Sequence, residues 1–151
     1  GSMRTYDNWV YDYRNMKDKP SYQLLPVGVG GVLYPPHSIP SAFLSEEDIL
    51  ENALYCDDLW LKFAAALNGY PTVLVREAYN APLIEGSQEV ALWRTNTGMG
   101  GNDAAIDNVQ RYCTAHGYDW NRLLRRIRCI GDDGEWIGPD SVTYDSIQPC
   151  L

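Results

Sequence analysis

Two adjacent acids, Asp57 and Asp58, stand directly before an apolar segment in the sequence CDDLWLKFAAALNGY. An acid at the start of a helix accepts hydrogen bonds from unpaired backbone N–H groups and complements the helix dipole. One acid is enough for that purpose. A carboxylate fixed at the end of a buried helix can also act as a general base, and the helix dipole keeps it ionised near neutral pH. The pair is therefore a candidate acid-base site, with helix capping as the simpler alternative.

The other groups that could do chemistry give weaker signals. GVGGV at residues 28–32 lacks the spacing of a nucleotide-binding loop, so a bend or β-bulge is the preferred interpretation. GMGGND at residues 98–103 precedes a helical pattern and could hold an anion, although a flexible loop with a capping Asn is the preferred interpretation. His37 and His116 have no partner at metal-ligand spacing, so no metal site is predicted. A nucleophile assembled in space with a His stays open.

Helices and strands must position these residues. Residues 45–50 begin with Ser and three acids, which predicts an N-cap and a short helix. A second helix is predicted over 57–67, apolar around most of its circumference and ended by Asn68-Gly69 as a left-handed cap. Residues 71–75 are apolar and rich in branched side chains, so a buried strand is predicted there. Residues 24–33 are also apolar but are interrupted by three glycines, so they are predicted to be a buried strand or a bent loop that passes close to another part of the chain.

Two more helices are predicted in the second half of the chain. One follows Asn102 and Asp103, either of which can cap it, and has apolar residues at helical spacing. The last begins near residues 118–120 and carries apolar residues on one side and arginines on the other. The expected fold is therefore α/β, with a small mixed sheet flanked by three or four helices.

The composition excludes several classes of partner. The chain has 151 residues, 45% apolar and 21% charged, which is typical of one globular domain. Its net charge of −8 argues against nucleic acid, because a phosphate backbone requires clustered Lys and Arg. The four cysteines are widely spaced and no secretory signal accompanies them, so free thiols are expected. No run reaches the roughly 20 apolar residues of a membrane span, so a cytoplasmic location, extending to the inner face of the membrane, is expected.

The order of the predicted elements carries a family resemblance. GVGGVLYPP at residues 28–36 and CDDLWLKFAAALNGYPTVLV at residues 56–75 lie in sequence order, followed by GGND at 100–103. This order resembles the second half of glycosyltransferases of the GT-A fold, whose family 2 members have a Gly-Gly strand, a Glu-Asp pair starting a helix, and a Gly-Tyr turn into a strand. The sequences GGVLYPP, DDLWLK and GGND are similar to those of a bacterial subgroup that builds surface polysaccharides.

The resemblance implies a role for each matching residue. Asp58 would be the catalytic base that removes the proton of an acceptor hydroxyl, with Asp57 in the place of the family's Glu. The other positions implied in substrate binding are Gly30, Gly31, Tyr34, Trp60, Lys62, Asn102 and Asp103. For Trp60 the hydrophobic core is the preferred alternative, and for Lys62 an ion pair with an acid at helical spacing.

The implied reaction is transfer of a sugar from a nucleotide-sugar donor to a saccharide acceptor in polysaccharide biosynthesis. In the family a donor-binding first half holds a divalent metal, Mn or Mg, through an Asp-x-Asp motif. No Asp-x-Asp occurs in this sequence. The chain is therefore expected to be the acceptor-side half, with no cofactor of its own and little or no transferase activity alone. A partner subunit, a homo-oligomer formed through an uncovered apolar face, and a membrane-associated acceptor are all compatible with this expectation.

The expected domain organisation is a tag remnant at 1–3, a linker or arm at 4–23, the acceptor-side domain at 24–130 and an irregular tail at 131–151. Two other classes of function stay open. With 11 Tyr and five Trp, the chain has the flat apolar faces of a non-catalytic carbohydrate-binding module. The arginine-rich segment 120–128 could instead make it a protein-interaction module.

Overall fold

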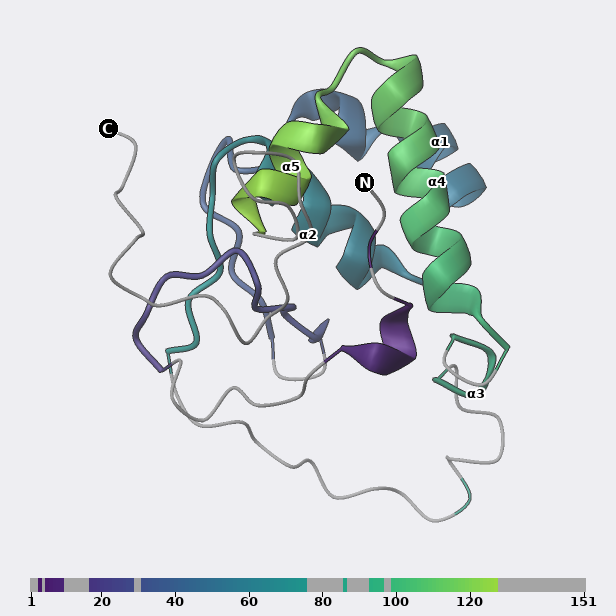
Figure 1. The fold of residues 1–151 in the computed structure, drawn as a ribbon, viewed down its shortest axis with the longest axis horizontal. Coiled ribbons are helices and arrows are strands. Elements are labelled where there is room, and N and C mark those ends of the chain that lie inside the picture. The colour runs from purple at the N-terminus through teal and green to yellow at the C-terminus, as the bar shows by residue number, and fades with distance from the viewer. Residues whose placement is uncertain are drawn as a thin grey trace.

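The structure is a computed structural model of the chain, and it describes residues 3, 5–9, 17–28, 31–75, 86, 93–96 and 99–127. Within these ranges the regular secondary structure is helical. The elements are the 3-10 helices η1 (Tyr6–Asn8) and η4 (Ser41–Leu44) and the α-helices α1 (Glu46–Asn52), α2 (Asp57–Leu67), α3 (Trp93–Asn96), α4 (Gly101–Ala115) and α5 (Trp120–Arg126). Helix α2 packs against both α4 and α5, while α1 and α3 pack against α4 (Figure 1). The predicted tail at 131–151 lies outside the described residues.

The predicted α/β fold with a small mixed sheet is wrong for the described part of the chain, which is mainly helical and contains no strand or sheet. The valine-rich segment 71–75 is extended, but it makes only isolated bridges, from Thr72 to Ser21 and from Leu74 to Lys17. Its Val75 side chain is 75% exposed. A run of branched apolar residues favours extended backbone, and it becomes a buried strand only when partners cover both faces.

For the described part of residues 24–33 the structure agrees with the bent-loop alternative and not with a buried strand. Pro26 has no N–H to donate to a neighbouring strand. Gly31 has a φ of +84°, a left-handed conformation that interrupts extended backbone. Leu33 is 91% exposed, so the described part of this segment is not a buried element.

The helix predictions are confirmed where their signals are local. Helix α2 spans the predicted residues 57–67, and Gly69 follows it with a φ of +90°. The Ser45 hydroxyl caps α1 by accepting from the backbone N–H of Asp48. Capping of α2 by one of its acids is not seen: the N-cap is Cys56, without a side-chain cap bond, and both acids lie in the first turn.

The core is an aromatic cluster that joins α2 to its neighbours. Trp60 is fully buried, and its indole N–H donates to the carbonyl oxygen of Phe43 in η4 at 2.8 Å. The Trp60 ring centroid lies 4.9 Å from that of Phe43 and 4.8 Å from that of Tyr112 in α4. This packing confirms the hydrophobic core as the place of Trp60 and fixes α2 against η4 and α4.

Replacing Trp60 with Phe should lower the free energy of unfolding by about 1–3 kcal/mol, since it creates a small cavity and leaves the buried Phe43 carbonyl without its donor. Chemical denaturation measures the change. Tyr55→Phe is the matched control, because the Tyr55 side chain is 57% exposed and should tolerate the loss of its hydroxyl. Equal stability of Trp60→Phe and the native chain would contradict the importance of this contact.

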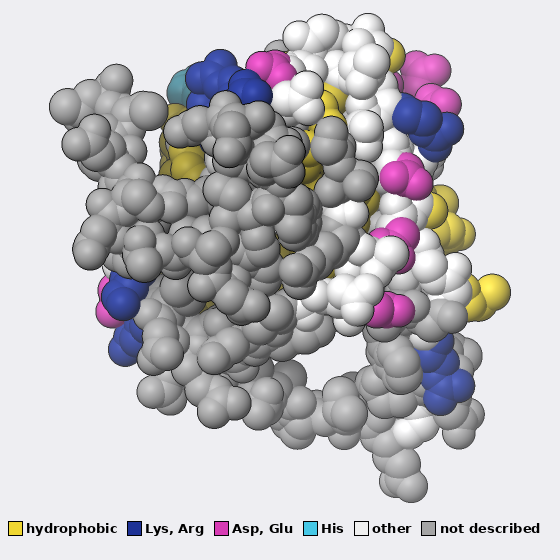
Figure 2. All heavy atoms as spheres, in the orientation of Figure 1, with side chains coloured by type: hydrophobic (Ala, Val, Ile, Leu, Met, Phe, Trp, Pro, Cys, Tyr) yellow, Lys and Arg dark blue, Asp and Glu magenta, His cyan; other side chains and the backbone are white. Residues whose placement is uncertain are grey.

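The side of the molecule formed by α1 and α4 is largely acidic. Figure 2 shows Asp and Glu side chains spread along this side with apolar side chains between them. Leu50, Leu54 and Tyr55 are each more than half exposed. Oligomer formation through an apolar face stays a prediction. Over the described ranges, the structure has no helix with the length and apolar character of a membrane span.

Candidate functional site

The candidate site forms where the start of α2 meets the glycine-rich segment before residue 34. Asp58, the second residue of α2, is half-buried. Its carboxylate accepts the backbone N–H of Gly28, with the nitrogen 3.1 Å from Oδ1 and 3.2 Å from Oδ2. Two segments that the sequence singled out separately, 30 residues apart, are thus in direct contact. Sequence reasoning noted the GVGGV segment but did not predict this hydrogen bond.

The surroundings of Asp58 make its carboxylate more basic than an exposed one. Burial raises the pKa of Asp58, the hydrogen bond from Gly28 lowers it, and the negative charge of Asp57 raises it, so that the balance lies above the ordinary value. Asp57 itself is exposed at the first position of α2. A more basic carboxylate is a better proton acceptor, which suits the role of general base.

Tyr34 lies beside the two acids. Its side chain is half-buried. Burial raises the pKa of the Tyr34 phenol, and the charges of Asp58 and Asp57 raise it further. The phenol therefore keeps its proton at neutral pH. The site thus has a neutral O–H donor within the electrostatic range of the Asp58 carboxylate, and each group can bind a ligand hydroxyl.

Cys56, immediately before the acids, is buried and faces α4. Its Sγ lies 3.4 Å from Oδ1 of Asn102, to which the thiol donates, and 3.7 Å from the carbonyl oxygen of Gly101. Burial raises the pKa of the Cys56 thiol, and the charges of Asp57 and Asp58 do so too. A thiol held protonated is a poor nucleophile, so this cysteine has a structural role.

The free-thiol prediction is confirmed for Cys56 and Cys113, both of which are buried. Burial raises the pKa of Cys113 to about 12. The other two cysteines, Cys129 and Cys150, lie outside the described residues.

Asn102 and Asp103 are committed to contacts within the chain. The prediction that one of them caps α4 is wrong. The N-cap of α4 is Gly100, which has a left-handed conformation and no side-chain cap bond. Buried Asn102 accepts from the Cys56 thiol and so joins α4 to the start of α2. The Asp103 carboxylate accepts the backbone N–H of Tyr6 at 2.7 Å. Asn102 is thus adjacent to the residue that precedes the acid pair, whereas Asp103 anchors η1.

Lys62 is buried and hydrogen-bonded to Thr72. It is 4% exposed, and its Nζ donates to Oγ1 of Thr72 at 2.9 Å. Burial lowers the pKa of Lys62 to about 7. The ion pair predicted for Lys62 with an acid at helical spacing is absent from the described part of the structure. Its position and that of Trp60 place both side chains in the interior and leave Asp58 and Tyr34 as the groups that define the site.

Of the two glycines predicted to bind substrate, the structure describes one. Gly31 is exposed in a turn, where its N–H donates to the carbonyl oxygen of Gly28 at 2.9 Å. Gly30 lies outside the described residues. No three His, Cys, Asp or Glu side chains gather as metal ligands among the residues that were placed.

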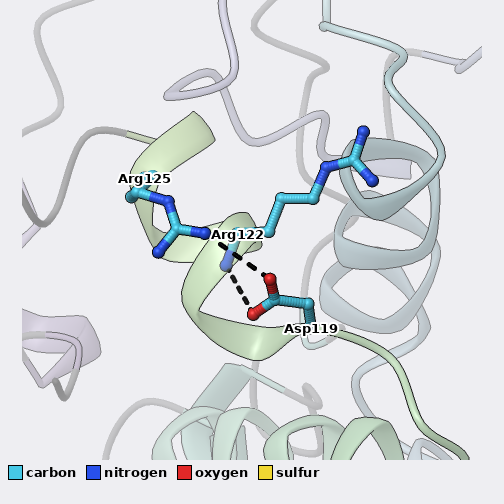
Figure 3. A network of polar contacts seen from close by, with 3 residues as sticks. All are labelled: Asp119, Arg122 and Arg125. Carbon is cyan, nitrogen blue, oxygen red and sulfur yellow. Dashed lines mark hydrogen bonds and ion pairs between the residues drawn. The ribbon is translucent and has the colours of Figure 1, made fainter. Parts of the chain in front are cut away.

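The arginine-rich helix α5 uses two of its arginines within the fold. The Asp119 carboxylate caps α5 by accepting the N–H of Arg122 at 2.9 Å and lies 3.5 Å from the guanidinium of Arg125 (Figure 3). The Arg126 guanidinium donates to the carbonyl oxygens of Ala66 and Leu67 at the end of α2. Arg126 therefore holds two helices together and is not part of a free cationic face.

Comparison of the chain with protein-family models, curated proteins and solved structures gives no match. The function has to be inferred from the residues of the site.

Proposed function

We propose that this chain is the acceptor-side part of a glycosyltransferase, in which a saccharide hydroxyl binds between Tyr34 and Asp58. The observation that carries the proposal is the half-buried Asp58 carboxylate, held by the Gly28 N–H and raised in pKa, beside the protonated Tyr34 phenol. A base of this kind must be fixed in position and more basic than an ordinary aspartate, and Asp58 has both properties. The sequence order of residues 28–36 and 56–75 resembles that of family 2 glycosyltransferases and supports the same role, although the described residues of 24–33 and 71–75 do not form the strands that this family has there.

In the proposed reaction Asp58 removes the proton of the acceptor hydroxyl as that oxygen attacks the anomeric carbon of the donor sugar. The new C–O bond forms while the bond from the anomeric carbon to the diphosphate oxygen breaks, and the nucleoside diphosphate leaves with the electron pair. Tyr34 donates a hydrogen bond that orients the acceptor. The donor and its divalent metal would be held by a donor-binding half, whereas Asp58 and Tyr34 of this chain act on the acceptor.

Saccharide binding by this chain tests the proposal directly. Titration with oligosaccharides, followed by NMR, should shift the signals of Asp58, Tyr34 and Gly28. Tyr34→Phe should weaken binding by roughly 2- to 10-fold, the effect of losing one hydrogen bond. Asp107→Asn, on the exposed side of α4, is the control and should bind as the native chain does. If saccharides shift signals elsewhere and leave this site unchanged, the proposed acceptor site is wrong.

A further inference from the structure

Gly28 is a glycine for a reason that its own backbone does not supply. The described glycines with a left-handed φ are Gly31, Gly69, Gly86, Gly100 and Gly117, and Gly28 is not among them. A Cβ at position 28 would lie 3.1 Å from Oδ1 of Asp58 and 4.0 Å from its Cγ. A side chain at position 28 would therefore require the Asp58 carboxylate to move by a few tenths of an ångström.

Hydrogen bonds involve both backbone polar groups of Gly28. The Gly31 N–H donates to the Gly28 carbonyl oxygen at 2.9 Å, and Gly31 has a left-handed φ of +84°. The Gly28 N–H, which belongs to the preceding peptide group, meets both oxygens of the Asp58 carboxylate, at 3.1 and 3.2 Å, and this contact restricts rotation of the Asp58 side chain.

We propose that Gly28 is the positioning residue of the Asp58 site: its N–H fixes the carboxylate, and its missing side chain leaves the room that the carboxylate needs. The catalytic meaning of this arrangement rests on the proposed function, whereas the anchoring is a property of this chain alone. The titratable neighbours of Asp58 are Asp57 and Cys56 at the start of α2 and Tyr34 after the turn. Burial and the charge of Asp57 both disfavour the ionised carboxylate, and the Gly28 N–H favours it.

The test measures the pKa of Asp58 by carboxyl carbon NMR in the native chain, in Gly28→Ala and in Gly28→Val. The added side chains should displace the carboxylate and lengthen the hydrogen bond, which raises the Asp58 pKa by about 0.5–1 unit, more in Val than in Ala. Gly117→Ala is the matched control, since Gly117 has a φ of +74° and no atom within 4 Å of its Cβ position. This control should destabilise the fold and leave the Asp58 pKa unchanged.

A second measurement covers the case in which the Gly28 variants do not fold. The amide proton of Gly28 should titrate with the pKa of Asp58 in the native chain and lose this transition in Asp58→Asn. An unchanged Asp58 pKa in the folded Gly28 variants, or a Gly28 amide that does not follow Asp58, would overturn the proposal. A shifted pKa in a chain that binds no saccharide would leave the positioning intact and refute only the proposed function.

Discussion

Replacing Asp58 with Asn should lower the rate of glycosyl transfer by roughly 10²- to 10⁴-fold, because the amide cannot accept the proton of the acceptor hydroxyl. The assay uses an enzyme in which this chain is combined with a donor-binding half, and it measures kcat with a nucleotide-sugar and a saccharide acceptor. Saccharide affinity should change little, since Asn keeps the size of Asp and one of its two acceptor oxygens. Loss of turnover with retained binding is the result expected of a base.

One control variant separates this result from general damage. Asp57→Asn changes the neighbouring, exposed acid and should reduce kcat less than Asp58→Asn does. It should also lower the pKa of Asp58, because the charge of Asp57 raises that pKa in the native chain. If Asp58→Asn leaves kcat unchanged and weakens saccharide binding, the site is a carbohydrate-binding site without chemistry.

Replacing Lys62 with Met should stabilise the fold by about 3 kcal/mol at pH 7. The Lys62 pKa is lowered from 10.5 to about 7 in the folded chain. Between these values the unfolded chain holds a proton that the folded chain lacks, so the stability of the native chain rises with pH, by about 2 kcal/mol from pH 7 to pH 9. Below pH 7 the folded chain also binds the proton, and the full penalty of the buried charge applies. Met has a similar length and needs no charge, and it gives up only the hydrogen bond to Thr72.

Urea unfolding of both proteins at pH 7, 8 and 9 measures this effect. The difference between the two slopes isolates Lys62 from other groups that titrate in this range. Lys17→Met changes an exposed lysine and should keep the pH dependence of the native chain. A pH-independent native stability, together with a less stable Lys62→Met, would show that the buried ammonium is stabilised by a partner.

The sequence predicts the helices of this protein well because their signals lie within each helix. The apolar circumference of 57–67 and the Gly at position 69 need no knowledge of distant residues. A strand, in contrast, exists only with a neighbour, and residues 71–75 show no sign of whether one is present. In the described structure they meet residues 17 and 21 at isolated bridges, and Val75 stays exposed.

Only the local part of the candidate site could be predicted from the sequence. Asp58 could be singled out because an extra acid at the start of a buried helix is a local feature. Its contact with Gly28 spans 30 residues, and no spacing rule reveals it. The ion pair predicted for Lys62 was wrong because helical spacing from Asp58 suggests a pair on the helix surface. The packing of α2 instead buries this side chain, which donates to Thr72.

The contact of Arg126 with the last carbonyl groups of α2 has a consequence for how the molecule opens. Because the guanidinium of α5 binds the oxygens of Ala66 and Leu67, fraying of α2 at this end also breaks the tie to α5. The two helices should therefore exchange their amide protons as one cooperative unit, and Arg126→Ala should separate them. Asp58 lies at the opposite end of the same helix, so opening of the whole unit also displaces Asp58.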